Sequence, residues 1–412
     1  MTEIGTLLLS NAIHGLSVKP GLIVHCDWST SASKRWIAAA RLLPTGFYEA
    51  TVPIPVGSTD SFFSRLREKL PVGAIMAGFD FPIGVPRAYA ERAGFARFPE
   101  MLLCLGTGLW ADFYKPAARP DEISLNRPFY PRAPGGTNKK QLLDGLGMRS
   151  AEDLLRLCDQ PTSTRGNACE IFWTLGANQV GRAAIHGWSE LLAPAVRNGS
   201  ISIWPFDGEL ATLLASAGII VLEAYPAETY GHLGLSRSFG KRTCEGRRSQ
   251  ARAILFWCER NGVVLQPNMV ADVEHGFGDA KTGEDTFDTF IGLLGMIEAV
   301  CDPARCVAPQ DPAVRNIEGW TLGTDPASIR QHPARREVVC LAGQGTKVFP
   351  RETTPAKTQH ELVRDRLCPA CQRKRFVRWP WGWDGHAAHG CPGIPGDTPE
   401  ERKRNYRERY LG

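Results

Sequence analysis

The chain has 412 residues, of which 43% are hydrophobic and 22% are charged, and its formal net charge is +5. This length exceeds that of one typical domain, so we expect one large domain with a substantial core and a smaller second part. No run of about 18 apolar residues is present, which excludes a membrane-spanning helix.

The N-terminus and the cysteines favour a cytoplasmic protein. Residues 1–10 have neither the basic n-region nor the full apolar stretch of a signal peptide. The twelve cysteines are scattered except near the C-terminus, and without a secretory signal we expect them to be reduced rather than paired in disulfides.

Two apolar segments early in the chain each end in an aspartate. The stretch Gly21-Leu-Ile-Val-His-Cys-Asp27 predicts a buried strand, and residues 36–43 predict a returning strand after a polar turn. A third strand and a helix follow, and Ala74-Ile-Met-Ala-Gly-Phe-Asp80 then predicts a fourth strand. This order would place the fourth strand beside the first and bring Asp27 and Asp80 together.

Residues 87–217 interrupt the strand pattern and predict a helical insertion. Helix-like stretches within it are segments 87–95, 150–157, 169–178 and 188–196, whereas the helix before the fourth strand covers residues 58–70. Between them lies a loop rich in Pro and Arg, over residues 127–140, which is either a solvated surface loop or a functional one. In the functional case, Arg127 and Lys139 are candidates for phosphate contact.

A third apolar strand ending in an acid, Gly218-Ile-Ile-Val-Leu-Glu223, precedes a second basic loop. That loop holds four candidates for phosphate contact: Lys241, Arg242, Arg247 and Arg248. A helix over residues 249–262 follows. The last helix, over residues 283–300, carries Asp285 and Asp288 three residues apart on one face of its first turn.

These acids suggest one carboxylate cluster of catalytic residues: Asp27, Asp80, Glu223, Asp285 and Asp288. A lone aspartate at a strand end would more simply cap a turn, but a buried carboxylate without a partner is costly and here the pattern recurs. Several carboxylates repel one another unless they hold divalent cations, and all-oxygen ligands favour Mg²⁺ or Mn²⁺.

Seven short motifs are spread over residues 20–325: Cys-Asp27-Trp-Ser, Gly-Phe-Asp80-Phe-Pro-Ile-Gly, Phe172-Trp-Thr-Leu-Gly, Trp204-Pro-Phe-Asp-Gly208, Glu223-Ala-Tyr-Pro-Ala-Glu-Thr-Tyr230, Glu284-Asp285-Thr-Phe-Asp288 and Glu318-Gly-Trp320. As a set they resemble a functionally undefined family of predicted nucleases with a ribonuclease H-like fold. The resemblance implies a mixed five-stranded sheet, its second strand antiparallel, with helices on both faces.

The resemblance also implies a two-metal site. In the wider superfamily, which includes Holliday-junction resolvases, acids on the first strand, the fourth strand and the last helix bind two metal ions. Matched by position, these acids are Asp27, Asp80 and either Asp288 or Asp285, while Glu223 is an extra acid.

Such a site suits phosphodiester hydrolysis, because two cations about 4 Å apart can activate a water and stabilise the leaving oxygen. On this hypothesis Asp27 bridges the two ions, Asp80 binds one, and Asp285 and Asp288 bind the other. Four cations are expected to contact phosphate: Lys34, Arg35, Lys241 and Arg242.

Residues 366–412 predict a separate zinc-binding module. Cys368-Pro-Ala-Cys371 and the later group His386, His389 and Cys391 have the spacing of a structural zinc site, with four of these five residues as ligands. A redox Cys-x-x-Cys is the alternative, but it would need no distal His and Cys set.

The same module contains all of the excess positive charge. Residues 366–412 hold 10 Lys or Arg and 5 Asp or Glu, whereas the preceding residues hold 38 of each. Arg378, Trp379 and Trp381 suit contact with the phosphates and bases of nucleic acid, or else the tryptophans form the module's small core.

The sequence therefore predicts an α/β protein with three parts: a ribonuclease H-like nuclease domain over residues 1–325, a linker over 326–365 and a zinc module over 366–412. The predicted activity is metal-dependent cleavage of DNA or RNA. Two alternatives are a non-catalytic nucleic-acid-binding protein that uses the zinc module, and an ATPase or sugar kinase of related fold. In the latter, Ser29, Thr30 and Ser31 could bind phosphate, but a second Gly-rich phosphate hairpin is lacking.

Overall fold

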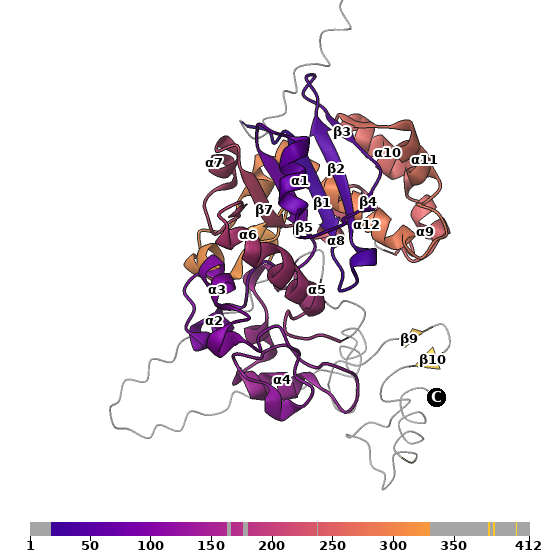
Figure 1. The fold of residues 1–412 in the computed structure, drawn as a ribbon. Helices are drawn as coiled ribbons and strands as arrows, with labels where there is room; N and C mark the ends of the chain where they lie inside the picture. Colours follow the sequence, from indigo (N-terminus) through magenta and orange to yellow (C-terminus); the bar gives the residue numbers. More distant parts are fainter. Residues whose placement is uncertain are drawn as a thin grey trace, which may run out of the picture. The chain divides into compact units, whose positions relative to one another are not determined.

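The computed structural model describes residues 18–162, 166–175, 180–236, 238–329, 378–379, 382–383 and 401. The chain divides into two compact units, Met1–Ala334 and Arg335–Gly412. The first unit has an α/β architecture, in which helices lie on both faces of a central sheet (Figure 1). In the second unit the described strands are β9 (Arg378–Trp379) and β10 (Gly382–Trp383), which pair antiparallel.

The central sheet mixes parallel and antiparallel strands in the order β6-β7-β5-β1-β2-β3-β8, with β4 paired to β2. The strands are β1 (Leu22–Asp27), β2 (Trp36–Leu42), β3 (Tyr48–Ala50), β4 (Ile54–Pro55), β5 (Ile75–Phe79), β6 (Ser202–Ile203), β7 (Ile219–Glu223) and β8 (Val263–Leu265). β1 runs antiparallel to β2 and parallel to β5, and β7 runs parallel to β5. The predicted adjacency of the strands that lead to Asp27 and Asp80 is confirmed, with Cys26 opposite Phe79.

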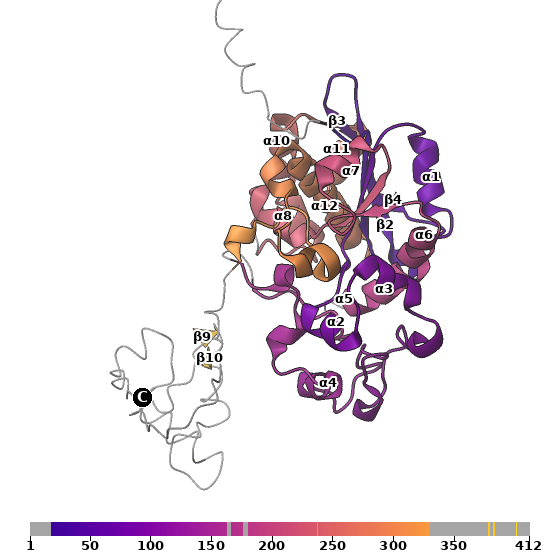
Figure 2. The same ribbon diagram turned by 90° about the vertical axis from the view of Figure 1, so that its left-hand side faces the viewer.

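Helices cover both faces of the sheet, and Figure 2 shows α8, α11 and α12 on one side and α1, α3 and α6 on the other. The α-helices are α1 (Phe62–Lys69), α2 (Arg87–Ala93), α3 (Phe98–Cys104), α4 (Lys139–Leu146), α5 (Val180–His186), α6 (Ala193–Arg197), α7 (Leu210–Ala215), α8 (Pro226–His232), α9 (Cys244–Arg248), α10 (Ala251–Arg260), α11 (Pro267–Glu274) and α12 (Gly283–Cys301). Across the described ranges, no helix combines the length and apolar character needed to cross a bilayer.

Alternate residues of the central strands supply two separate cores. In β1, Leu22 and Val24 pack with the side chains of α1, whereas Ile23 packs with those of α12. Because side chains alternate between the faces of a strand, Asp27 falls on the α12 face. The same alternation along β5 directs Asp80 toward α12, which explains why these two acids share a face.

The segment between β5 and β7 is less helical than its sequence predicts. Residues 150–157 form only short 3-10 turns, Ala151–Leu154 and Leu157–Asp159, and the described residues 169–175 are not helical. There, the Tyr130 amide donates to the Phe172 carbonyl and the Thr174 amide donates to the Tyr130 carbonyl. The backbone therefore bonds to a distant loop instead of to its own next turn. The segment also supplies β6, which pairs with β7.

Other predicted helices are confirmed with small shifts of their ends. They correspond to α1, α2, α10, α12 and a π-helical turn at Gly187–Leu192 that continues into α6. The eight cysteines among the described residues are all free thiols.

A close contact between Gly292 and His25 sets the spacing of α12 on β1. A Cβ atom at Gly292 would lie 2.2–2.4 Å from atoms of the imidazole ring. His25 is fully buried, and its ring nitrogens lie 3.1 and 3.3 Å from the carbonyl oxygens of Thr289 and Ala224. Burial lowers the pKa of His25 to about 4, although both carbonyls act in the opposite direction. Since His25 precedes Asp27 by two residues, the same contact sets how far Asp27 lies from α12.

We expect Gly292→Ala to destabilise the protein by about 1–3 kcal/mol through overpacking, although alanine normally favours a helix over glycine. Urea unfolding measures this loss. If the imidazole is the obstacle, the double variant His25→Ala/Gly292→Ala should lose less than the sum of the two single losses. Strictly additive losses would show that the clash lies elsewhere.

Candidate functional site

Four of the predicted acids line one cavity of about 640 Å³: Asp27, Asp80, Asp285 and Asp288. The cavity forms where the ends of β1 and β5 meet the first turns of α12, and residues of α5 and α8 complete its walls. Glu284, next to Asp285 on α12, is a fifth carboxylate in the lining. We call this space the acidic cavity.

The pKa shifts of the inner pair, Asp27 and Asp80, favour one proton held between the two carboxyl groups. Burial raises the pKa of Asp27 well above its usual range, and the Asp80 charge and a hydrogen bond to Asp80 raise it further. Burial also raises the pKa of Asp80 to about 7, while the bonds from Asp27 and from the Trp28 amide limit that rise. The Trp28 amide donates to Asp80 Oδ1 at 2.7 Å, which fixes the orientation of this carboxylate. The directions of the two shifts make Asp27 the member that keeps the proton and Asp80 the oriented acceptor.

The charges of the outer acids, Glu284, Asp285 and Asp288, are compensated by neighbouring side chains rather than by a shared proton. Asp288 Oδ2 lies 2.6 Å from the Lys241 ammonium, and Asp288 Oδ1 accepts a hydrogen bond from the Tyr230 hydroxyl. Glu284 lies 3.4 Å from the same ammonium. Burial raises the pKa of Asp285, whereas the charge of Lys34 at the cavity wall lowers it.

The acidic cavity has an excess of negative charge. Its lining holds five carboxylates against three cations, Lys34, Arg182 and Lys241. Arg182 is partly committed, because it donates to the carbonyls of Thr174 and Arg132 at 3.2 and 2.7 Å. Uncompensated charge in a partly buried space must take up protons or bind cations. The inner pair takes up a proton, and the carboxylate oxygens of the cavity can also bind cations.

Glu223, also predicted as a catalytic acid, does not join the acidic cavity. In the sheet register Glu223 lies opposite Phe79, one position before Asp80. Because a shift of one residue reverses the direction of a side chain, Glu223 points to the face of the sheet opposite to that of Asp80. Ile219 and Val221 lie on the same face as Glu223. The position level with Asp80 on this strand is Ala224.

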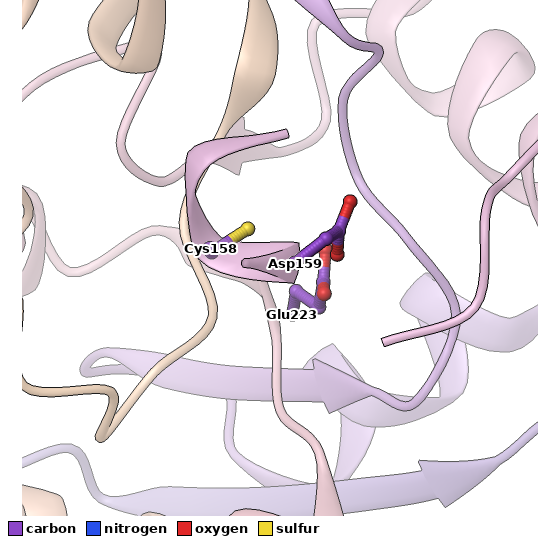
Figure 3. A group of neighbouring side chains, drawn as sticks. All are labelled: Cys158, Asp159 and Glu223. Atoms are coloured by element: carbon purple, nitrogen blue, oxygen red, sulfur yellow. The ribbon is translucent and has the colours of Figure 1, made fainter. Parts of the chain in front are cut away.

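Glu223 instead belongs to a buried ionic network with Arg156 and Asp159. Figure 3 shows the carboxylates of Asp159 and Glu223 side by side next to Cys158. The Arg156 guanidinium donates to Glu223 at 2.6 and 2.9 Å and to Asp159 at 2.8 and 2.9 Å. Glu223 also accepts from the Ile83 amide at 2.7 Å, three residues after Asp80. The network thus anchors the loop that follows Asp80.

The same network contains a possible metal-binding group. Among the described residues, it is the one set of three such side chains whose ligand atoms all lie within 4.8 Å of one another: Cys158, Asp159 and Glu223. Arg156 already donates four charge-assisted bonds to the two carboxylates, and burial raises the pKa of the Cys158 thiol. A metal ion there would have to expel a guanidinium that is 1% exposed. These residues fit a structural ion pair better than a metal centre.

The predicted phosphate contacts divide into those at the cavity and those bound elsewhere. Lys34 and Lys241 line the acidic cavity. Arg35 is buried, and its guanidinium binds Glu190 at 2.7 Å and the carbonyl of Ser29 at 2.7 Å. Arg35 therefore holds the turn after β1 instead of presenting donors to a ligand.

The remaining basic candidates lie outside the lining of the acidic cavity. Arg247 is buried and donates to the backbone carbonyls of Lys241, Gly276 and Gly278. Arg127 pairs with Glu122 at 3.0 Å and Lys139 pairs with Glu170 at 2.6 Å. Arg242 and Arg248 are exposed.

Four residues of this region were not identified as site residues from the sequence: Arg156, Arg182, Tyr230 and Glu284. Glu284 and Tyr230 lie within quoted motifs, and the spacing of Glu284 and Asp288 by four residues places them on one helix face. That spacing could have identified Glu284. No local pattern marks Arg156 or Arg182, because Glu223, to which Arg156 binds, and Arg132, whose carbonyl binds Arg182, are distant in sequence.

The predicted zinc ligands Cys368, Cys371, His386, His389 and Cys391 lie outside the described residues, as does Trp381. Arg378 and Trp379 form β9, for which only the backbone is described. Comparisons with protein-family models, with curated proteins and with solved structures each found no significant match to this chain.

The inner pair should make stability without bound metal depend on pH. Burial raises the folded pKa of Asp27 well above its usual value of 3.8, so the folded protein loses stability as pH rises above that value toward the folded pKa. We expect Asp27→Asn to be more stable than the wild type in chelator at pH 8 by about 1–3 kcal/mol, and the gap to shrink toward pH 5. Urea unfolding at several pH values measures the gap.

His25 titrates in both proteins, so its contribution cancels in this difference. Asp144→Asn is a matched control, because Asp144 is 63% exposed and pairs with Lys140 on the surface of α4. Its stability difference from the wild type should stay constant from pH 5 to 8. A gap for Asp27→Asn that does not change with pH would contradict the shared proton.

Proposed function

We propose that this protein is a metal-dependent nuclease of ribonuclease H-like fold that hydrolyses phosphodiester bonds of DNA or RNA. The observation that carries the proposal is the acidic cavity. Two adjacent parallel strands and the last helix contribute Asp27, Asp80, Asp285 and Asp288 to one space, beside Lys34 and Lys241. Acids that lie so close to basic side chains suit a site for cations and phosphate together.

The strand order supports the fold assignment. The central strands are arranged β3-β2-β1-β5-β7, and β2 is antiparallel to both of its neighbours. The antiparallel second strand and the helices on both faces agree with what the sequence resemblance implies, whereas the described sheet has eight strands instead of five, with β4, β6 and β8 in addition. Because one fold can serve several chemistries, the reaction is argued from the cavity itself.

The donor set fits a hard divalent cation. All the candidate ligands are carboxylates, and carboxylate oxygens favour Mg²⁺ or Mn²⁺. Asp27 and Asp80 would hold an ion at the inner end of the cavity, and Asp285 and Asp288 would hold one on the α12 side. Such ions, when bound, activate a water and stabilise the leaving oxygen of the phosphodiester.

The chain's own groups would orient the substrate. Lys34 and Lys241 place two ammonium groups where they can bind non-bridging phosphate oxygens. Ser29, Thr30 and Ser31 line the same cavity, and their hydroxyls can donate to phosphate. The turn that presents them is held by Arg35, which donates to the Ser29 and Thr30 carbonyls.

The C-terminal module completes the proposal as a zinc-held grip on nucleic acid. Its support is the sequence pattern of Cys368, Cys371, His386, His389 and Cys391, together with the basic excess of residues 366–412. Nucleic acid attracts such excess charge in a manner that depends on salt.

We expect the wild type to cleave members of a panel of DNA and RNA substrates, single-stranded, duplex and branched, with Mg²⁺ or Mn²⁺ but not with EDTA. Asp27→Asn, Asp285→Asn and Asp288→Asn should each lower the cleavage rate by about two to three orders of magnitude, because each removes a cation ligand. Initial rates on labelled oligonucleotides measure the effect.

Asp144→Asn, on the surface of α4, should keep the wild-type rate. Cleavage that survives in Asp27→Asn with its metal dependence intact would remove the acidic cavity from the reaction. Binding without cleavage would favour a non-catalytic protein, and saturable binding of ATP in its place would favour a kinase-like reaction.

One zinc atom per chain is expected by elemental analysis of protein purified without chelator. Zinc should supply much of the folding free energy of so short a module, on the order of 10 kcal/mol. Cys371→Ser should lose the zinc, weaken nucleic-acid binding and flatten its salt dependence. Cys244→Ser is the control, because the Cys244 thiol lies against the His275 carbonyl in the first unit. A zinc-free wild type would contradict the assignment.

A further inference from the structure

Lys241 occupies a position that a metal ion at α12 would need. Its ammonium lies 2.6 Å from Asp288 Oδ2 and 3.4 Å from Glu284 Oε1. The other oxygen of Asp288 accepts from the Tyr230 hydroxyl. Both oxygens of Asp288 are therefore engaged by the protein, and a cation that binds Oδ2 directly competes with the ammonium for that oxygen.

The backbone of Lys241 is fixed, whereas its side chain can move. The buried Arg247 guanidinium donates to the Lys241 carbonyl at 2.7 Å and to the carbonyls of Gly276 and Gly278 at 2.8 and 2.7 Å. These bonds tie the loop to the connection between α11 and α12. The Lys241 side chain is 39% exposed and faces the acidic cavity, so its long stem can carry the ammonium away from Asp288.

We infer that Lys241 is a built-in counter-ion of Asp288, which a divalent cation displaces, and that the released ammonium then binds the phosphodiester in the same cavity. The inference rests on the proposed nuclease function and adds an order of events, with the cation before the substrate. In the metal-free protein, Lys241 compensates the outer acids.

Two physical facts favour displacement of the Lys241 ammonium by the cation over binding of both at Asp288 Oδ2. A magnesium ion lies about 2.0–2.1 Å from its oxygen ligands, so it cannot occupy Oδ2 beside an ammonium already in contact without strong repulsion. The displaced ammonium remains in a cavity where phosphate is its natural partner. Lys34 differs, since it forms no ion pair within 4.0 Å among the described residues, although it lines the same cavity.

The test is a titration of each full-length variant with Mn²⁺ alone, followed by electron paramagnetic resonance. Lys241→Met keeps the apolar stem and removes the competing charge, so it should bind Mn²⁺ about five- to tenfold more tightly than the wild type. Lys34→Met is the matched control for a cavity lysine, and it should gain less because it blocks no ligand oxygen. Adding Asp288→Asn to Lys241→Met should cancel the gain.

Oligonucleotide cleavage by the same variants tests whether the released Lys241 ammonium binds the phosphodiester. Lys241→Met should raise KM and flatten its salt dependence even at saturating Mn²⁺, because one phosphate contact is lost. Lys241→Gln serves in both assays if the methionine variant fails to fold.

Unchanged or weaker Mn²⁺ affinity in the neutral variants would overturn the inference, as would an unchanged KM. The proposed function fails differently, by absence of cleavage in the wild type. Because the Mn²⁺ titration contains no nucleic acid, it reports the displacement of Lys241 in either case.

Discussion

The pairing of β1 with β5 creates the interaction on which the rest of this site depends, which is the repulsion between Asp27 and Asp80. Parallel register places Cys26 opposite Phe79, so the next residue on each strand is an acid on the same face. The strands cannot separate these carboxylates without breaking the sheet. The molecule must therefore compensate the charge locally, with a shared proton, with cations or with both.

The chain compensates its buried acids in two different ways. Glu223 and Asp159 receive a fully buried arginine, whose rigid fork donates to both carboxylates at once. The acids of the cavity receive flexible lysines and a proton, which can both be exchanged. The first arrangement suits a permanent brace of the loop after Asp80, and the second suits a site that binds and releases charged groups.

Arg35 and Arg247 have an indirect role in this arrangement. Each is buried and donates to backbone carbonyls of a loop that borders the acidic cavity. Arg35 shapes the turn after β1, and Arg247 fixes the base of Lys241. Basic residues that looked like phosphate contacts thus determine where Ser29 and Lys241 are presented, without contacting a ligand themselves.

The sequence by itself determined the α/β class, the adjacency of the first and fourth strands, and the convergence of Asp27, Asp80, Asp285 and Asp288. Apolar runs and helical spacing are local signals, and a chain-order rule joined them. Only the tertiary structure decided that Glu223 is bound by Arg156 and that Lys241 covers Asp288. The physical reason is that strand register and side-chain pairing depend on residues distant in sequence, and one position of register turns a side chain to the other face.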